Sequence, residues 1–132
     1  MIHGNLIHLI SNTIPLLFLG GTLFFFYNRI GTRVFFSCYF IPSIIVWFLD
    51  GSGTVHIGAS GLIYGVAAFL ISFGILRRDM MSILISIVVI LLYGGIFYGV
   101  LPTDPRVSWQ MHLAGTIVGV VMAFVFRNTK KI

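Results

Sequence analysis

The chain has 132 residues, of which 58% are hydrophobic and only 8% are charged. A soluble domain carries about 25% charged residues, so this composition excludes a soluble globular domain and indicates a protein that lies in a membrane. The formal net charge is +5. The basic residues stand in short gaps between apolar runs rather than on one polar face, which argues against nucleic-acid binding.

Five apolar runs follow one another along the chain, and most are long enough to cross a bilayer. A crossing helix needs roughly 20 apolar residues, because each residue adds about 1.5 Å across a hydrocarbon core about 30 Å thick. The sequence therefore predicts an all-α, polytopic transmembrane bundle of about five spans in a single domain. The predicted spans cover about residues 5–27, 34–49, 57–76, 82–101 and 109–127.

The breaks between the runs are NRIGTR, DGSGTVH, RRDMMS and LPTDPRVS, which are rich in Gly, Pro and charged residues. Basic loops remain in the cytoplasm, so their distribution predicts the orientation of the chain. Seven of the eight basic residues lie in the first break, the third break and the tail: Arg29, Arg33, Arg77, Arg78, Arg127, Lys130 and Lys131. The sequence thus predicts a multi-pass protein of the bacterial cytoplasmic membrane, with its N-terminus outside and its C-terminus inside.

Four polar residues lie at a similar shallow depth within the predicted spans. Ser60 is near the outer start of the third run and His112 is near the outer start of the fifth. His8 and Asn12 lie in the outer part of the first run, four residues apart, and therefore share a helix face. Polar residues are costly inside a membrane and indicate function by default. Their common depth indicates one site.

Small residues recur on one face of the third run and on one face of the fifth. Such faces let helix backbones touch in lipid. A contact between these two runs would bring the Ser60 hydroxyl within hydrogen-bonding reach of the His112 imidazole. The small residues are Gly61, Gly65 and Ala68 in the third run, and Gly115, Gly119 and Ala123 in the fifth.

A serine beside a histidine has a chemical meaning. The hydroxyl becomes a nucleophile when a base takes its proton, and neutral histidine suits that task near pH 7. Gly58 and Gly61, on either side of Ser60 in the stretch HIGASGLIYG, let the backbone bend and a substrate come close. Free backbone N–H groups at the helix start, with the side chains of His8 and Asn12, are candidate donors to an oxyanion.

Three sequence motifs together resemble the rhomboid family of intramembrane serine proteases. They are GASG at residues 58–61, H-x4-H-x3-N formed by His3, His8 and Asn12, and HLAGTIVG from His112. The resemblance extends from about His3 to Arg127. The family has a further span before the H-x4-H segment, so the chain is expected to begin about where the second family span begins.

The resemblance implies a Ser-His dyad without an acidic third member, in which Ser60 is the nucleophile and His112 the general base. It implies that His8, Asn12 and the backbone N–H of Ser60 form the oxyanion hole, and that Tyr64 packs against the ring of His112. The implied substrates are single-span transmembrane proteins, cleaved near the outer membrane face through an acyl-enzyme. It implies no cofactor.

Other interpretations of the same residues stay open at this stage. A rhomboid-like protein that binds membrane helices without cutting them would use the same fold, although an intact Ser60 and His112 argue against it. A small transporter subunit would need polar residues at mid-membrane, where several runs are almost purely apolar. The four histidines do not predict a metal site, because ligands usually come with acidic or cysteine partners at tighter spacing.

Overall fold

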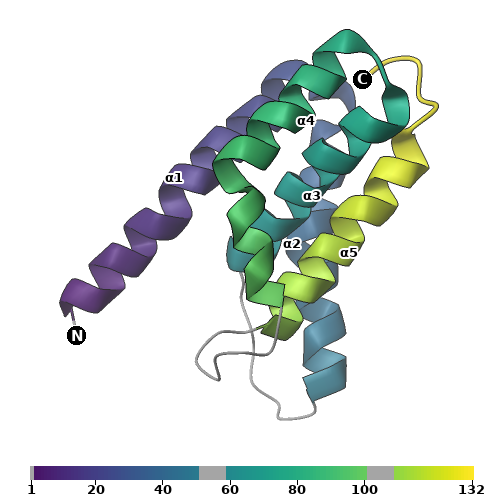
Figure 1. Ribbon diagram of the computed structural model, residues 1–132. Coiled ribbons are helices and arrows are strands. Elements are labelled where there is room, and N and C mark those ends of the chain that lie inside the picture. Colours follow the sequence, from purple (N-terminus) through teal and green to yellow (C-terminus); the bar gives the residue numbers. More distant parts are fainter. Residues whose placement is uncertain (1, 51–58, 101–108) are drawn as a thin grey trace.

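A computed structural model of the chain describes residues 2–50, 59–100 and 109–132 (Figure 1). Within these residues every regular element is helical, as the sequence predicts. The elements are α1 (Ile2–Phe26), α2 (Asn28–Asp50), α3 (Ala59–Arg77), α4 (Met80–Tyr93), the 3₁₀ helix η1 (Gly94–Val100) and α5 (Trp109–Phe126).

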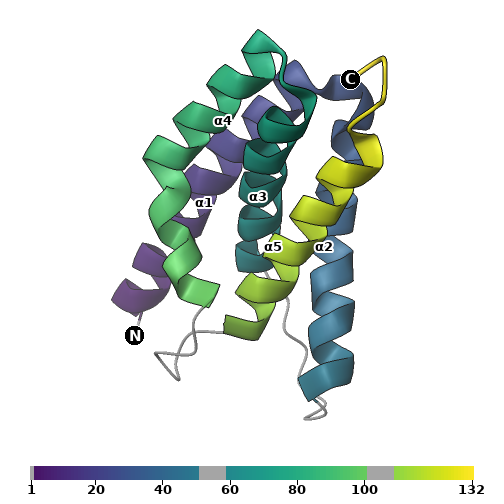
Figure 2. The same ribbon diagram turned by 45° about the vertical axis from the view of Figure 1, so that its right-hand side comes forward.

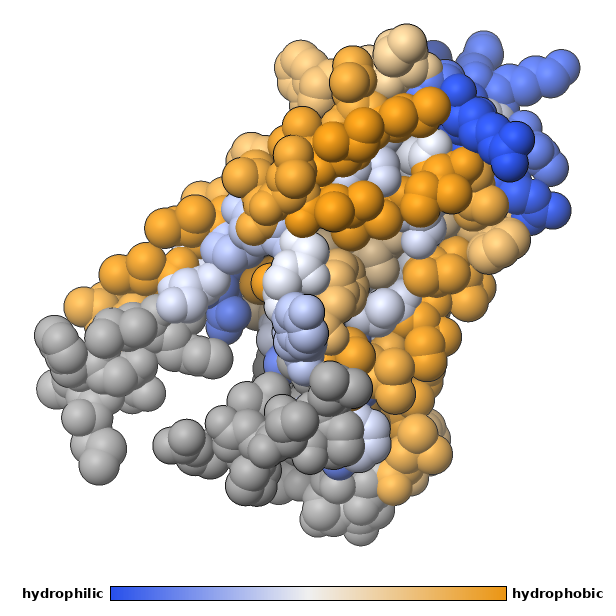
Figure 3. All heavy atoms as spheres, viewed as in Figure 1, coloured by the Kyte–Doolittle hydropathy of each residue, from blue (hydrophilic) through white to orange (hydrophobic). Residues whose placement is uncertain are grey.

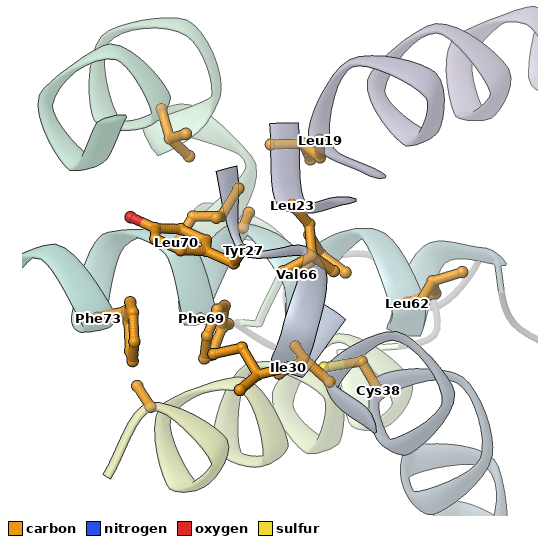
Figure 4. Packing of buried hydrophobic residues seen from close by; sticks show 14 of the residues in the cluster. Leu19, Leu23, Tyr27, Ile30, Cys38, Leu62, Val66, Phe69, Leu70 and Phe73 are labelled. Atoms are coloured by element: carbon orange, nitrogen blue, oxygen red, sulfur yellow. The ribbon is translucent and has the colours of Figure 1, made fainter. Parts of the chain in front are cut away.

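Helix α3 is the centre of the bundle, and each of the other four α-helices packs against it (Figure 2). Its residues 61–70 are all buried, which is expected of a helix that is apolar all round. The core around it is formed by large apolar side chains from several helices (Figure 4). Among them are Leu19 and Leu23 of α1, Cys38 of α2, and Val66 and Phe69 of α3, each 0% exposed.

The face of the bundle seen in Figure 3 is apolar over most of its length. Exposed apolar side chains of the bundle include Leu17, Phe48 and Leu91, which are 70%, 71% and 79% exposed. Helices of this length and composition can cross a bilayer, in which such a surface would contact lipid. The segments long and apolar enough are Asn28–Leu49, Ala59–Arg77, Met80–Tyr98 and Trp109–Phe126, with a shorter apolar stretch at Ile10–Phe26.

Two predicted boundaries differ from the structure. The break NRIGTR is helical, because α2 begins at Asn28 and α1 ends at Phe26. Arginine is a good helix former, so the helix continues beyond its apolar part. The fourth run changes to a 3₁₀ helix at Gly94, where two consecutive glycines weaken the α-helix. The second and fourth breaks fall largely on residues 51–58 and 101–108, outside the described residues.

Candidate active site

Ser60 and His112 lie at the starts of two helices that run in the same direction. Ser60 is the second residue of α3, and His112 belongs to the first turn of α5. Both helices start at the same end of the bundle (Figures 1 and 2). Both residues are half-buried. The structure therefore places a hydroxyl and an imidazole at one end of the bundle, on neighbouring helices.

Glycines let the backbones of α3 and α5 touch beside these two residues. A Cβ atom added at Gly115 would overlap the carbonyl oxygen of Gly61, the residue after Ser60. A Cβ atom at Gly61 would lie 2.8 Å from Sδ of Met111, the residue before His112. A larger residue at Gly115 would push the helices apart, whereas one at Gly61 would displace the Met111 side chain. The predicted contact between the small faces of the third and fifth runs is confirmed.

The same contact continues one turn deeper into the membrane. A Cβ atom at Gly119 would overlap the carbonyl oxygen of Gly65 and lie 3.0 Å from Cβ of Ala68. On its other side, a Cβ atom at Gly65 would lie 2.7 Å from Cβ of Cys38 in α2. Cys38 is a free, buried cysteine that fills the space between α2 and α3. Three helices are thus in close contact directly below the site.

Tyr64 connects the imidazole of His112 to a third element. Its ring stacks on the ring of His112, with centroids 4.1 Å apart and planes inclined by 6°. Its hydroxyl donates a hydrogen bond to the backbone carbonyl oxygen of Ile96 in η1. The ring of Phe97 packs edge-on against it, with centroids 5.7 Å apart. The His112 ring therefore has a fixed neighbour, and that neighbour also holds η1.

Comparison with known protein families identifies the family of the chain. The Rhomboid domain model matches residues 1–129. The chain belongs to the rhomboid family.

Relatives of this rhomboid chain occur in mycobacteria. The chain is 40% identical over 141 residues to proteins described as uncharacterized from Mycobacterium tuberculosis, Mycobacterium bovis and Mycobacterium leprae. The match covers 95% of the chain but 55% of the first two relatives and 53% of the third, so the chain spans about half their length. No solved structure matches it. Its family and its apolar helices make the chain an integral membrane protein.

The structure describes the other predicted site residues of this rhomboid only in part. Asn12 lies in α1 and is half-buried. The first turns of α1, which carry His8, lead away from α3 and α5 (Figure 1). The side chain of His8 and all of Gly58 lie outside the described residues. The role of His8 and Asn12 as oxyanion donors therefore stays a prediction.

Three neighbours of the site were not predicted from the sequence. Met111 is 1% exposed and packs on Gly61, while Ile96 and Phe97 of η1 contact Tyr64. Nothing in the apolar run 82–101 distinguishes Ile96 or Phe97 from its other apolar residues. Among the described residues, no three His, Cys, Asp or Glu side chains lie close enough to hold a metal ion.

Proposed function

We propose that the chain is an intramembrane serine endopeptidase. Ser60 is the nucleophile and His112 the general base, and the substrates are transmembrane proteins cut near the outer membrane face. The observation that carries the proposal is the contact between Gly61 and Gly115, which sets the backbones beside Ser60 and His112 against each other. The family to which the chain belongs supports the same chemistry.

The proposed reaction has two halves. His112 takes the Ser60 proton as the serine Oγ attacks the scissile carbonyl carbon. His112 then gives this proton to the leaving amine, the C–N bond breaks, and an acyl-enzyme remains on Ser60. Water attacks the acyl-enzyme while His112 accepts a water proton, and the new acid leaves as Ser60 regains its proton.

The surroundings of the two residues support these roles. The backbone N–H of Ser60 has no partner within its own helix, because it lies in the first turn of α3, so it can donate to the oxyanion. His8 and Asn12 are the proposed side-chain donors. Tyr64 limits rotation of the His112 ring by stacking on it. A general base held in one orientation loses less entropy when the reaction begins.

Basic residues lie at the opposite end of the bundle from Ser60, which supports an outward-facing site. Arg29, Arg77 and Arg127 are at the ends of the helices remote from the starts of α3 and α5 (Figure 1). In the cytoplasmic membrane of a bacterium this end would face inward. A reporter fused after Ile132 should therefore be active in the cytoplasm. A reporter active in the periplasm would contradict the proposal, because Ser60 would then lie near the inner face of the membrane.

Covalent labelling tests the nucleophile directly. The purified chain in liposomes should react with a fluorophosphonate probe, and Ser60→Ala should abolish the label. Ser72→Ala is the matched control, because Ser72 is half-buried in the same helix about three turns away and should label as the parent does. Label that survives Ser60→Ala would disprove the assignment.

A cleavage assay separates the protease from the non-catalytic alternative. Ser60→Ala and His112→Ala should each abolish cleavage of a single-span reporter, and the double variant should be no worse, because the pair acts as a unit. A parent that binds the reporter but neither labels nor cuts would instead be a membrane-helix binding protein.

A further inference from the structure

Basic side chains from segments far apart in the sequence meet at the inner end of the molecule. We define the inner end as the α1–α2 junction, the α3–α4 turn and the tail after α5 (Figures 1 and 3). Arg77 is paired there with Asp79, with Nε and Oδ1 3.4 Å apart. In the described part of the chain Asp79 is the one acidic residue at this end. The exposed basic residues are Arg29, Arg33, Arg78, Arg127, Lys130 and Lys131.

The tail is held in place by hydrogen bonds. Nη1 of Arg77 donates to the carbonyl oxygens of Arg127 and Thr129, at 3.2 and 2.5 Å. The backbone N–H of Arg29 donates to a main-chain oxygen of Ile132, at 3.0 Å. Lys130 and Lys131 lie between these anchored points. They are therefore held beside the first turn of α2, which carries Arg29, with Arg33 one turn further on.

These four residues, Arg29, Arg33, Lys130 and Lys131, form what we call the tail cluster. Arg29 and Arg33 are four residues apart and project from one face of α2. One guanidinium group can bind two phosphate oxygens at once, and each lysine ammonium adds a positive charge. The cluster thus has the chemistry of a phosphate site.

The same face of α2 continues as an apolar strip. Phe36 and Phe40 follow Arg33 at spacings of three and four residues, so they share the face of the two arginines. Both residues are 52% exposed, and their rings stack on each other with centroids 6.2 Å apart and planes inclined by 15°. A helix face with cations at its polar end and exposed rings below matches a phospholipid from its phosphate to its acyl chains.

We propose that the tail cluster and the Phe36–Phe40 strip bind an anionic phospholipid of the inner leaflet, such as phosphatidylglycerol. A free phosphate ion would bind the basic residues but would not contact the rings of Phe36 and Phe40. The exposed rings therefore favour a phospholipid over free phosphate as the ligand. Basic groups at the cytoplasmic ends of membrane helices are suited to anionic head groups. The proposal does not depend on the protease assignment.

Matched charge variants test for a discrete site. The purified chain in neutral detergent should melt at a higher temperature with added phosphatidylglycerol, but not with phosphatidylcholine or inorganic phosphate. R29Q/R33Q should weaken the apparent affinity by about 10-fold or more, since it removes two charge-assisted contacts. R78Q/R127Q removes the same charge from the same end and should cost less than about 3-fold.

Equal losses in the two double variants would overturn the proposal, since they would mean a diffuse attraction. Equal protection by inorganic phosphate would also overturn it, because the ligand would then be a free anion. K130Q/K131Q leaves α2 intact and should weaken lipid binding in the same direction, even if R29Q/R33Q fails to fold. Photoreactive phosphatidylglycerol should crosslink to α2 between residues 29 and 40, and crosslinks confined to α4 or α5 would contradict the site.

Discussion

Helices α5 and α4 both pack against α3 through glycines that admit a neighbouring backbone, and side-chain hydrogen bonds hold α4 in addition. Between α5 and α3 the contact is backbone against backbone, at Gly115 on Gly61 and at Gly119 on Gly65. This contact cannot slide or widen without losing its close packing. It lies directly below Ser60 and His112, where the proposed reaction would need fixed geometry.

The inner half of α4 is held to its neighbours by both packing and hydrogen bonds. A Cβ atom at Gly74 of α3 would overlap the backbone carbonyl oxygen of Ser82 and lie 2.5 Å from Cβ of Ser86. The Ser86 hydroxyl donates to the carbonyl oxygen of Ile71, at 2.9 Å. The hydroxyl of Tyr27 donates to Oγ of Ser82, also at 2.9 Å. The inner half of α4 is therefore as firmly placed as α5.

The outer end of α4 and the following η1 are more exposed. Leu91 and Tyr98 are 79% and 78% exposed, and a Cβ atom at Gly95 would meet open space. Tyr64 joins this region to the site by its hydrogen bond to Ile96. Ser60 and His112 therefore lie beside a close backbone contact, whereas η1 beside them is more exposed.

The largest effect is expected at the α3–α5 contact. Gly119→Ala puts a Cβ atom into the carbonyl oxygen of Gly65, so the helices must separate. We expect the free energy of unfolding to fall by about 3 kcal/mol, the upper range for overpacking, with loss of fluorophosphonate labelling at Ser60. Gly95→Ala is the control and should be nearly neutral. Similar melting temperatures for the two variants would mean that α5 is not held by close backbone contact.

A smaller and more local effect is expected at the link to η1. Tyr64→Phe keeps the ring on His112 and removes the hydroxyl that bonds to Ile96. One hydrogen bond is worth about 1 kcal/mol, so amide exchange in residues 94–100 should rise about 5-fold. Exchange in α5 should stay unchanged. Hydrogen-exchange mass spectrometry measures both, and faster exchange in α5 as well would refute an independent η1.

The inner half of α4 should respond in stability without a change in the site. Ser86→Ala removes the hydrogen bond to Ile71 and leaves its carbonyl oxygen with one partner fewer. We expect a loss of about 1 kcal/mol in the free energy of unfolding, with labelling of Ser60 unchanged. Ser72→Ala is the control. A loss of labelling in Ser86→Ala would mean that the inner half of α4 and the site are coupled.

The helix count and the α3–α5 contact could be predicted from the sequence, because apolar length and small-residue spacing are properties of the chain itself. Helix boundaries could not. Hydropathy marks where the hydrocarbon ends, whereas the backbone of α2 continues as a helix through Asn28 and Arg33. A hydropathy break is therefore not always a helix break.

The site could be predicted in part. The positions of Ser60 and His112 follow from motif spacing, and their proposed chemistry follows from the family. The bond from Tyr64 to Ile96 could not be predicted, because it depends on how a 3₁₀ segment of ordinary apolar residues folds back towards α3. The positions of His8 and Asn12, the predicted oxyanion donors, depend on the course of α1, which no local pattern specifies.

The smallest expected effect is a pH dependence at the start of α4. Asp79 is the N-cap of this helix and accepts a hydrogen bond from the Ser82 backbone N–H, at 3.1 Å. Burial alone would raise the pKa of the Asp79 carboxyl, but the hydrogen bonds from Ser82 and the charge of Arg77 outweigh burial and lower the pKa. An aspartate has a pKa of about 3.9 in an unfolded chain, so the ionised form favours the folded state.

This contribution should be present above about pH 4 and be lost as the pH falls through the lower pKa of the folded state. Asp79→Asn keeps a good N-cap residue but removes the titration. Between pH 6 and pH 3 the melting temperature of the parent should therefore fall further than that of Asp79→Asn. The Asp79 side chain is 43% exposed, so solvent screening should keep the difference below about 1 kcal/mol. An equal fall in melting temperature for the two chains would show that the Asp79 charge adds no stability beyond the N-cap. The inner end of α4 would then depend on its serines.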